Sequence, residues 1–427
     1  MVGIKGAAAL LLFAGQVLPT WCLTIEQFGM FSYLNSILVV MSVVAVWGTD
    51  RYSLKNIAIS RQDLISSKVS SDESVAKGAA SIRELVSSAY IVVLLNSILL
   101  AAGLLCWLPT KLATDYTVVL GGIAIFILMS RSMAVLSSAI TKGTDRVVAS
   151  ELIYSLIRPL VFAAICAVAY CAFEQVTLNF VLISFALSFL ISAVACHVVN
   201  LPVVTKSKKL CGASSVLRLY QSAFFFLLVS VGLPLMANIN TIQLGNMCEK
   251  SDVALYAIAA KLVSLVLLGL VSANLLIAPK LSPMFKNGDI QGMKKLIRNN
   301  NFVVAGITFV PVLIIVFFAE QILAVFGPQY VPAALSLRVL MIGQAVSVFC
   351  GPVVLTSTMT GLQKVAAFVV LGSCVINWVT CLFLIPHHAL IGAVIASVCA
   401  NTLLNISLAF VIYKRIGLNV TMLNLIK

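Results

Sequence analysis

The sequence predicts an all-α integral membrane protein with about twelve transmembrane helices, arranged as two six-helix bundles around a central cavity. Three observations predict it: the composition, the spacing of apolar windows and the placement of basic residues in the loops. Of the 427 residues, 61% are hydrophobic and 10% are charged, whereas a soluble globular chain has about 25% charged residues. The bilayer must therefore be the solvent for most of the side chains.

Apolar windows long enough to cross a bilayer recur along the whole chain, since a spanning helix needs about 20 mostly apolar residues. In chain order the windows cover residues 4–23, 28–47, 85–108, 117–140, 147–172, 176–199, 220–239, 253–278, 302–318, 335–359, 365–385 and 390–413. The first window resembles a signal peptide in its basic start, but no clear small-residue cleavage site follows it. We expect it to stay in the protein as the first membrane helix.

Basic residues fall in alternate loops. With a cytoplasmic N-terminus, the cytoplasmic loops contain most of them, including Arg51, Lys142 and Lys280, whereas the opposite loops contain only Lys111 and Lys250. The positive-inside rule therefore predicts that both termini are cytoplasmic. This distribution explains most of the net charge of +14, so the charge does not point to nucleic acid as a partner.

A weak internal repeat indicates two halves. Gly29-Met-Phe-Ser-Tyr-Leu opens the second window, and Ala254-Leu-Tyr-Ala-Ile-Ala opens the eighth. Halves separated by an even number of helices have the same orientation, so an axis along the membrane normal relates them. We expect an N-terminal bundle over residues 1–205 and a C-terminal bundle over residues 206–427, a layout typical of transporters.

A few basic residues lie inside the apolar windows and are not explained by the loops. They are Arg131, Arg158, Lys261 and Arg338. A charged side chain deep in a bilayer costs about 2.5 kcal/mol or more, so each is a candidate functional residue. Acidic residues lie only near the ends of the windows. Of these, Asp50 and Glu151 are the candidates for coupling to an ion gradient.

Arg158 is the strongest candidate because it lies too deep to reach the interface easily. It shares a helix face with Glu151, and Pro159 follows it, where a kink would expose backbone carbonyls. A structural ion pair between Glu151 and Arg158 is the alternative. For Arg131 and Lys261 the alternative is snorkelling towards the nearer interface.

Asn35 adds a polar position to the second window. It forms a polar face with Ser32 and Ser36, and Ser36 matches Lys261 in the repeat. Two polar faces at equivalent places in the halves predict a shared cavity. Arg338 lies only a few residues into its window, where an interfacial role is the alternative to substrate binding.

A cavity lined by arginine and lysine suits an anionic substrate. Guanidinium groups bind phosphate oxygens, and they do so more strongly where water is scarce. A pyrophosphate-linked lipid headgroup fits this charge, whereas a cationic substrate would need deep carboxylates. The eleven cysteines and three histidines show no metal-ligand spacing, so we expect neither a metal nor another cofactor.

Short motifs along most of the chain resemble those of a known family. They include Glu26-Gln-Phe-Gly-Met-Phe-Ser-Tyr, Asp252-Val-Ala-Leu-Tyr-Ala-Ile-Ala-Ala-Lys, Pro279-Lys-Leu-Ser-Pro-Met-Phe and Phe326-Gly-Pro-Gln-Tyr. These motifs resemble the O-antigen and polysaccharide flippases of the multidrug/oligosaccharidyl-lipid/polysaccharide exporter superfamily. Lys261 falls where that family often has a basic residue, and the family's cationic central cavity agrees with the charges described above.

The resemblance implies a two-lobed transporter of the bacterial inner membrane, without an enzymatic step. It would move undecaprenyl-pyrophosphate-linked oligosaccharide, such as the O-antigen unit of lipopolysaccharide, to the outer leaflet by alternating access. Its partners would be that lipid, the surrounding membrane lipids and other polysaccharide assembly proteins. A multidrug or cation exporter of the same superfamily is the alternative, and the lack of deep carboxylates argues against it. A membrane enzyme would be expected to have a large outer loop with catalytic residues.

Overall fold

The computed structural model describes residues 15, 18–66, 72–107, 117–172, 176–204 and 213–422, and these are almost entirely helical. Contacts divide the chain into two compact units. Apart from the first two residues, unit 1 comprises Gly3–Cys22 and Ile37–Pro234, and unit 2 comprises Leu23–Ser36 and Leu235–Lys427. Most of the predicted first window and the predicted bundle boundary at 205/206 lie outside the described residues, so that boundary stays a prediction.

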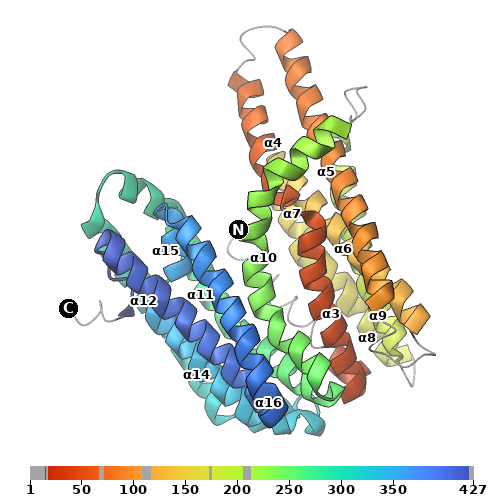
Figure 1. Cartoon of the computed structure of the whole chain (residues 1–427), viewed down its shortest axis with the longest axis vertical. Helices are drawn as coiled ribbons and strands as arrows, with labels where there is room; N and C mark the ends of the chain where they lie inside the picture. The colour runs from red at the N-terminus through yellow and green to blue at the C-terminus, as the bar shows by residue number, and fades with distance from the viewer. Residues whose placement is uncertain are drawn as a thin grey trace. The chain divides into compact units, whose positions relative to one another are not determined.

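Unit 1 is built around α6, which packs against α9, α5 and α4, while α8 packs on α9 (Figure 1). Its elements are α2 (Pro19–Cys22), α4 (Thr49–Ser66), α5 (Asp72–Trp107), α6 (Thr117–Gly143), α7 (Val147–Glu151), the π-helix η3 (Leu152–Ile157), α8 (Arg158–Ala172) and α9 (Leu178–Val204). Two further helices, α3 (Ile25–Val46) and α10 (Ala213–Met247), have residues in both units. Within a helix the backbone N–H and C=O groups bond to one another, as the bilayer core requires.

Unit 2 is built around α11, α14 and α16, with α12 packed on α11 and α14. Its elements are α11 (Lys250–Lys286), α12 (Ile290–Phe317), α13 (Ala319–Ala324), the 3₁₀ helix η4 (Pro328–Ala333), α14 (Ala334–Cys350), α15 (Val353–Met359) and α16 (Gln363–Ile416). The helix α16 contains two of the predicted windows. Its backbone leaves helical geometry at Ala389, where φ is 43° and ψ is −120°, between the windows at 365–385 and 390–413.

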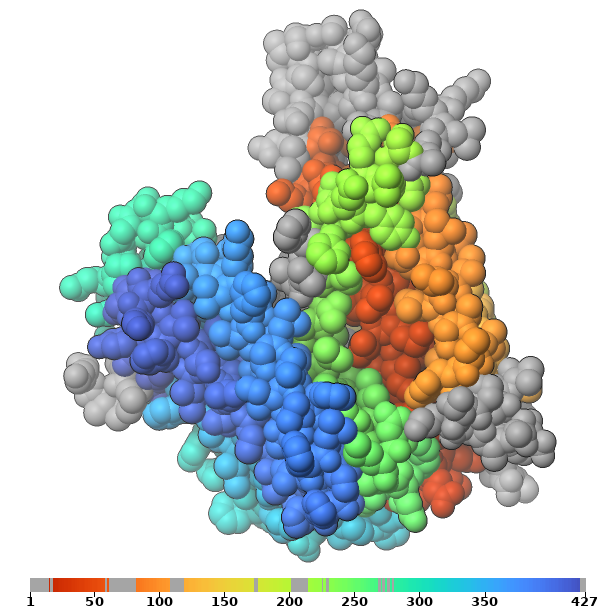
Figure 2. Space-filling model, viewed as in Figure 1, coloured from red at the N-terminus to blue at the C-terminus, as the bar shows by residue number. Residues whose placement is uncertain are grey.

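The predicted fold class, all-α and membrane-spanning, is confirmed. Among the described residues, eight helical segments are long and apolar enough to span a bilayer, and one of them is the double-length α16. Large apolar side chains lie on the outside, including Leu99 at 71% and Phe368 at 77% exposure. Figure 2 shows α5 (orange) and α16 (blue) at the visible surface. Such surfaces suit lipid contact.

Two glycines let α3 pack closely at each of its ends. In unit 2 a Cβ on Gly29 would lie 1.7 Å from the Lys250 carbonyl oxygen, so α3 and the start of α11 meet backbone to backbone. In unit 1, Gly48 just beyond α3 has φ +71° and would place a Cβ 2.4 Å from the Leu227 nitrogen. A larger residue at either site would force the backbones apart.

Candidate functional site

Two arginine side chains of unit 1 lie over one aromatic ring. Arg131 is on α6, Arg158 is the first residue of α8, and the ring belongs to Phe189 on α9. The Cζ atoms of Arg131 and Arg158 lie 5.1 and 4.5 Å from the Phe189 ring centroid. Both arginines are half-buried. The sequence placed them in separate windows, and the structure brings them together.

Arg158 is held by backbone and ring contacts. Its Nε donates to the Tyr154 carbonyl oxygen at 3.1 Å, and its Cζ lies 4.8 Å from the Tyr154 ring centroid. Among the described residues Arg158 has no carboxylate partner, so the alternative of an ion pair with Glu151 is not formed. Its remaining N–H groups and its positive charge are therefore available to a ligand.

A π-helical turn positions Arg158. The segment Leu152–Ile157 is π-helical, and the Arg158 N–H donates to the Ile153 carbonyl five residues earlier. Pro159 has no N–H to bond to the Ser155 carbonyl, which favours the widened turn just before it. Such π-bulges occur frequently at functional sites. The sequence indicated a kink at this proline but not this geometry.

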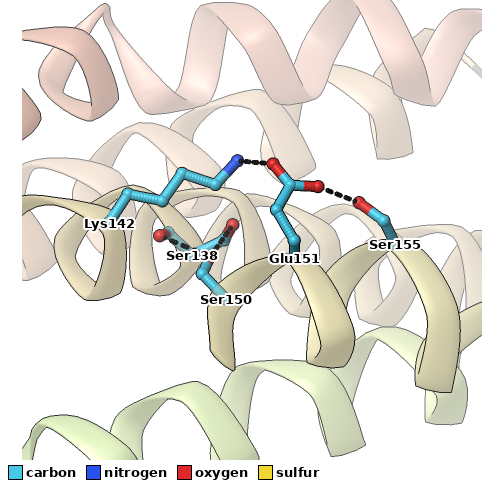
Figure 3. A network of polar contacts seen from close by, with 5 residues as sticks. All are labelled: Ser138, Lys142, Ser150, Glu151 and Ser155. Atoms are coloured by element: carbon cyan, nitrogen blue, oxygen red, sulfur yellow. Dashed lines mark hydrogen bonds and ion pairs between the residues drawn. The ribbon is translucent and has the colours of Figure 1, made fainter. Parts of the chain in front are cut away.

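A polar network begins directly before the π-turn (Figure 3). Lys142 Nζ lies 3.0 Å from Glu151 Oε1, and Ser155 Oγ donates to Glu151 Oε2 at 2.9 Å. The hydroxyls of Ser138 and Ser150 are 2.9 Å apart. Glu151, one coupling candidate, thus contacts Lys142 in the last turn of α6 and the π-turn that carries Arg158.

The other coupling candidate, Asp50, borders a cavity next to this network. The cavity has a volume of about 200 Å³ and is lined by Asp50, Arg51, Leu54, Val135, Ser138, Ala139, Lys142 and Tyr154. Asp50 Oδ1 has no hydrogen-bond partner in the described part of the chain, and burial raises the pKa of this carboxyl above its ordinary value. Through Tyr154, the cavity adjoins Arg158.

In unit 2, Lys261 lies against phenylalanine rings of α3. Its Nζ is 4.7 Å from the Phe28 ring centroid and 5.8 Å from that of Phe31. Phe28 in turn meets Tyr330 of η4 edge to face, with centroids 5.9 Å apart. Asn35, one helical turn beyond Phe31, is half-buried. Lys261 and Asn35 therefore come from two helices of one unit, whereas the repeat placed them in different halves, and their joint role in binding stays a prediction.

Arg338 lies in a different environment. Its Nη2 is 3.0 Å from Glu320 Oε1, and both side chains are substantially exposed; its Nε donates to the Val316 carbonyl at 3.1 Å. This geometry is that of a surface ion pair, which contributes about 0–1 kcal/mol. It matches the interfacial alternative, and a binding role for Arg338 stays a prediction. In the searched part of the chain no His, Cys, Asp or Glu cluster could hold a metal ion.

The sequence identified the cations but not the rings beneath them. Phe189, Phe28 and Tyr154 belong to a chain with 22 phenylalanines and 10 tyrosines. Nothing local distinguishes these rings from the aromatic residues that face lipid. Two signals were usable: Phe28 lies in the motif that opens the second window, and Tyr154 shares a helix face with Arg158.

Comparisons with known proteins agree with this fold. The sequence profile of a family described as polysaccharide biosynthesis protein matches residues 2–285, while no curated protein matches the chain by sequence. An inward-facing multidrug resistance MATE family transporter of the MOP superfamily aligns with a TM-score of 0.74 and 12% identity, over 96% of this chain and 94% of the other. The lipid II flippase MurJ, in an inward closed conformation, aligns with a TM-score of 0.70 and 12% identity, over 98% of this chain and 89% of the other. A MATE protein in a bent conformation aligns with a TM-score of 0.58 and 14% identity, over 98% of this chain and 94% of the other.

Proposed function

The chain belongs to the polysaccharide biosynthesis protein family, and from that premise we propose that it is a flippase for undecaprenyl-pyrophosphate-linked oligosaccharide. It would carry this lipid across the bacterial inner membrane by alternating access, and an O-antigen unit is the oligosaccharide that the sequence motifs suggest. The observation that carries the proposal is the pair Arg131 and Arg158 over the Phe189 ring.

The pair suits a pyrophosphate group for electrostatic reasons. Two guanidinium groups beside one ring repel each other, and a ligand with several anionic oxygens removes that repulsion. Each guanidinium presents N–H groups in a planar fork that matches phosphate oxygens. The apolar walls around Phe189 lower the local dielectric, which strengthens these bonds once water is displaced.

The neighbouring network keeps the positive charge concentrated at the arginines. Glu151 neutralises Lys142 at 3.0 Å, whereas Arg158 has no carboxylate partner among the described residues. Lys261, held by Phe28 in unit 2, would be a second cationic contact for the substrate. A cationic drug would meet only repulsion at these groups, which disfavours the exporter alternative.

The proposal is tested in a strain that lacks its own flippase. Expression of the wild-type chain should restore surface polysaccharide and clear carrier-linked oligosaccharide from the cytoplasmic leaflet, as measured by lipid extraction and mass spectrometry. Efflux of a cationic dye, measured in the same cells, should not change. Dye efflux without glycan restoration would favour the exporter and overturn the proposal.

Coupling to an ion gradient is proposed for Asp50 and Glu151. Asp50 borders the cavity that also contains Lys142, and Glu151 holds that lysine. A change of protonation at Asp50 would therefore alter the charge beside the π-turn that carries Arg158. Flux into proteoliposomes that is indifferent to both proton and sodium gradients would exclude coupling.

A further inference from the structure

A second cavity lies wholly within unit 2, between α10 and α16. Its volume is about 420 Å³, and its lining residues are Leu235, Ile239, Ile242, Gln243, Asn246, Leu371, Cys374, Val375 and Trp378. Cavities of about 300–1,000 Å³ with mostly apolar walls and a few polar groups are typical of small-molecule sites. None of the candidate site residues discussed above lines it.

The lining of the cavity changes in polarity along both helices. On α10 it runs from Leu235 to the amides of Gln243 and Asn246 near the helix end. On α16 it runs from Leu371 to Trp378. A hydrogen bond also joins the two helices, since Cys381 Sγ donates to Asn240 Oδ1 at 3.0 Å. The cavity is therefore a feature of a packed helix pair.

Gln243 is the polar group that points to a ligand. Its side chain is 7% exposed, it lines the cavity, and it makes no hydrogen bond to the described residues. An amide that faces a cavity can exchange hydrogen bonds to water for hydrogen bonds to a ligand. The neighbouring Asn246 is oriented by Tyr33, whose hydroxyl donates to its Oδ1 at 2.6 Å, and its N–H donors have no partner in the described structure.

Among the described residues, none that lines the cavity is charged, which restricts the occupant. A phosphate or an ammonium group buried here would lose its hydration without gaining a counter-charge. A sugar rich in hydroxyl groups would find only two amides to bond. The occupant that fits is uncharged, carries apolar surface, and offers a few hydrogen-bonding groups at one end.

We propose that this cavity binds an uncharged, hydroxyl-poor sugar residue of the substrate, of the 6-deoxyhexose or N-acetylhexosamine class. The C–H face of the sugar would lie on Trp378, which is 46% exposed, its hydroxyl or amide group would bond Gln243 and Asn246, and its methyl or acetyl group would face Ile239 and Leu371. The inference rests on the proposed function and assigns the glycan, as distinct from the pyrophosphate, to unit 2.

The test is saturation-transfer NMR on the full chain in lipid nanodiscs. The probes are the methyl glycosides of a 6-deoxyhexose, of N-acetylglucosamine and of glucose, with inorganic pyrophosphate and farnesol as further ligands. We expect the 6-deoxy or N-acetyl glycoside to bind more tightly than the glucoside. Gln243→Leu should weaken that binding about 5- to 10-fold, while Gln363→Leu, an exposed glutamine outside the cavity, should not change it.

The outcomes separate this inference from the proposed function. Equal binding of all three sugars, or no effect of Gln243→Leu in a variant that keeps wild-type elution and helicity, overturns the inference. If farnesol binds, Gln243→Leu leaves that binding unchanged and no sugar binds, the cavity is a lipid pocket. This outcome also overturns the inference. Pyrophosphate binding that depends on Arg158 but is unaffected by Gln243→Leu leaves the proposed function standing, whatever the sugars do.

Discussion

The two units hold intramembrane cations in a common way but surround them differently. In unit 1, Arg131 and Arg158 both lie over the Phe189 ring. Next to them is the polar network that contains an ion pair and several hydroxyl groups. In unit 2, Lys261 lies over the Phe28 ring. The serines and Asn35 of the predicted polar face are on the same helix as Phe28. A carboxylate would neutralise a buried cation, whereas a ring stabilises it and leaves its charge for a ligand.

That contrast has a chemical consequence. Unit 1 concentrates positive charge, which suits phosphate. Unit 2 combines Lys261, which lies over the Phe28 ring, with amides at Gln243 and Asn246, which suit uncharged polar groups.

The largest effect is expected in unit 2, from a mutation that should separate Phe28 from Lys261. Gly29→Ala places a Cβ only 1.7 Å from the Lys250 carbonyl oxygen. The helix α3 must therefore shift, and Phe28 moves away from Lys261. We expect a loss of about 3 kcal/mol in the free energy of unfolding, the upper range for overpacking. Thermal unfolding in detergent measures it. Gly103→Ala, with no atom within 4 Å, is the control, and an equal effect of the two changes would contradict the prediction.

The next effect addresses the arginine pair of unit 1. Arg158→Ala should lower oligosaccharide flipping about 10- to 100-fold, because a charge-assisted hydrogen bond contributes about 1.5–3 kcal/mol. Arg158→Lys should recover part of the activity, since it keeps the charge but loses the planar fork. Flipping is measured as above, with membrane abundance checked by immunoblot. Arg298→Ala, an exposed arginine of α12, should behave as wild type; unchanged flipping in Arg158→Ala would remove the basis of the anion site.

A smaller effect tests the ring beneath Lys261. Phe28→Leu keeps apolar bulk but removes the π-face, and a cation–π contact contributes about 0.5–1 kcal/mol or more. We expect flipping to fall about 2- to 10-fold, with Phe28→Tyr close to wild type. Phe317→Leu, at a 71% exposed position, is the matched control. If Phe28→Leu matched this control, the ring would only fill space.

The smallest effect is a pH dependence from Asp50, which lies beyond the span Ile25–Val46. Burial raises the pKa of its carboxyl, and Arg51 opposes that shift. The folded chain therefore holds this proton more tightly than the unfolded chain. The free energy of unfolding should fall as the pH rises from the ordinary carboxyl pKa through the raised one, and level off above it.

Asp50→Asn carries no titrating proton and should remove that decline. Thermal unfolding is measured at a series of pH values that starts at the ordinary carboxyl pKa and rises until the stability levels off. Asp145→Asn changes an exposed aspartate and should leave the pH profile as in the wild type. A profile that keeps its slope in Asp50→Asn would show that another group titrates.

Much of the fold could be predicted because its signals are local. A window of apolar residues predicts a span wherever it lies, and a lysine in a loop or an arginine in a span is visible without knowing its neighbours. The break inside α16 was also visible, as a gap between two windows. By contrast, the assignment of residues 23–36 to unit 2 depends on Gly29 and Tyr33 packing against the α10–α11 connection, which no local pattern shows.

The sequence by itself determined that the chain is a membrane protein and which cations its apolar windows contain, because hydropathy and charge are properties of each segment alone. Only the tertiary structure decided that Phe189 lies beneath two arginines, that Lys142 pairs with Glu151 beside a π-turn, and that Gln243 and Trp378 line one cavity. These contacts join residues from different helices, and which helix faces meet depends on the packing of the whole unit.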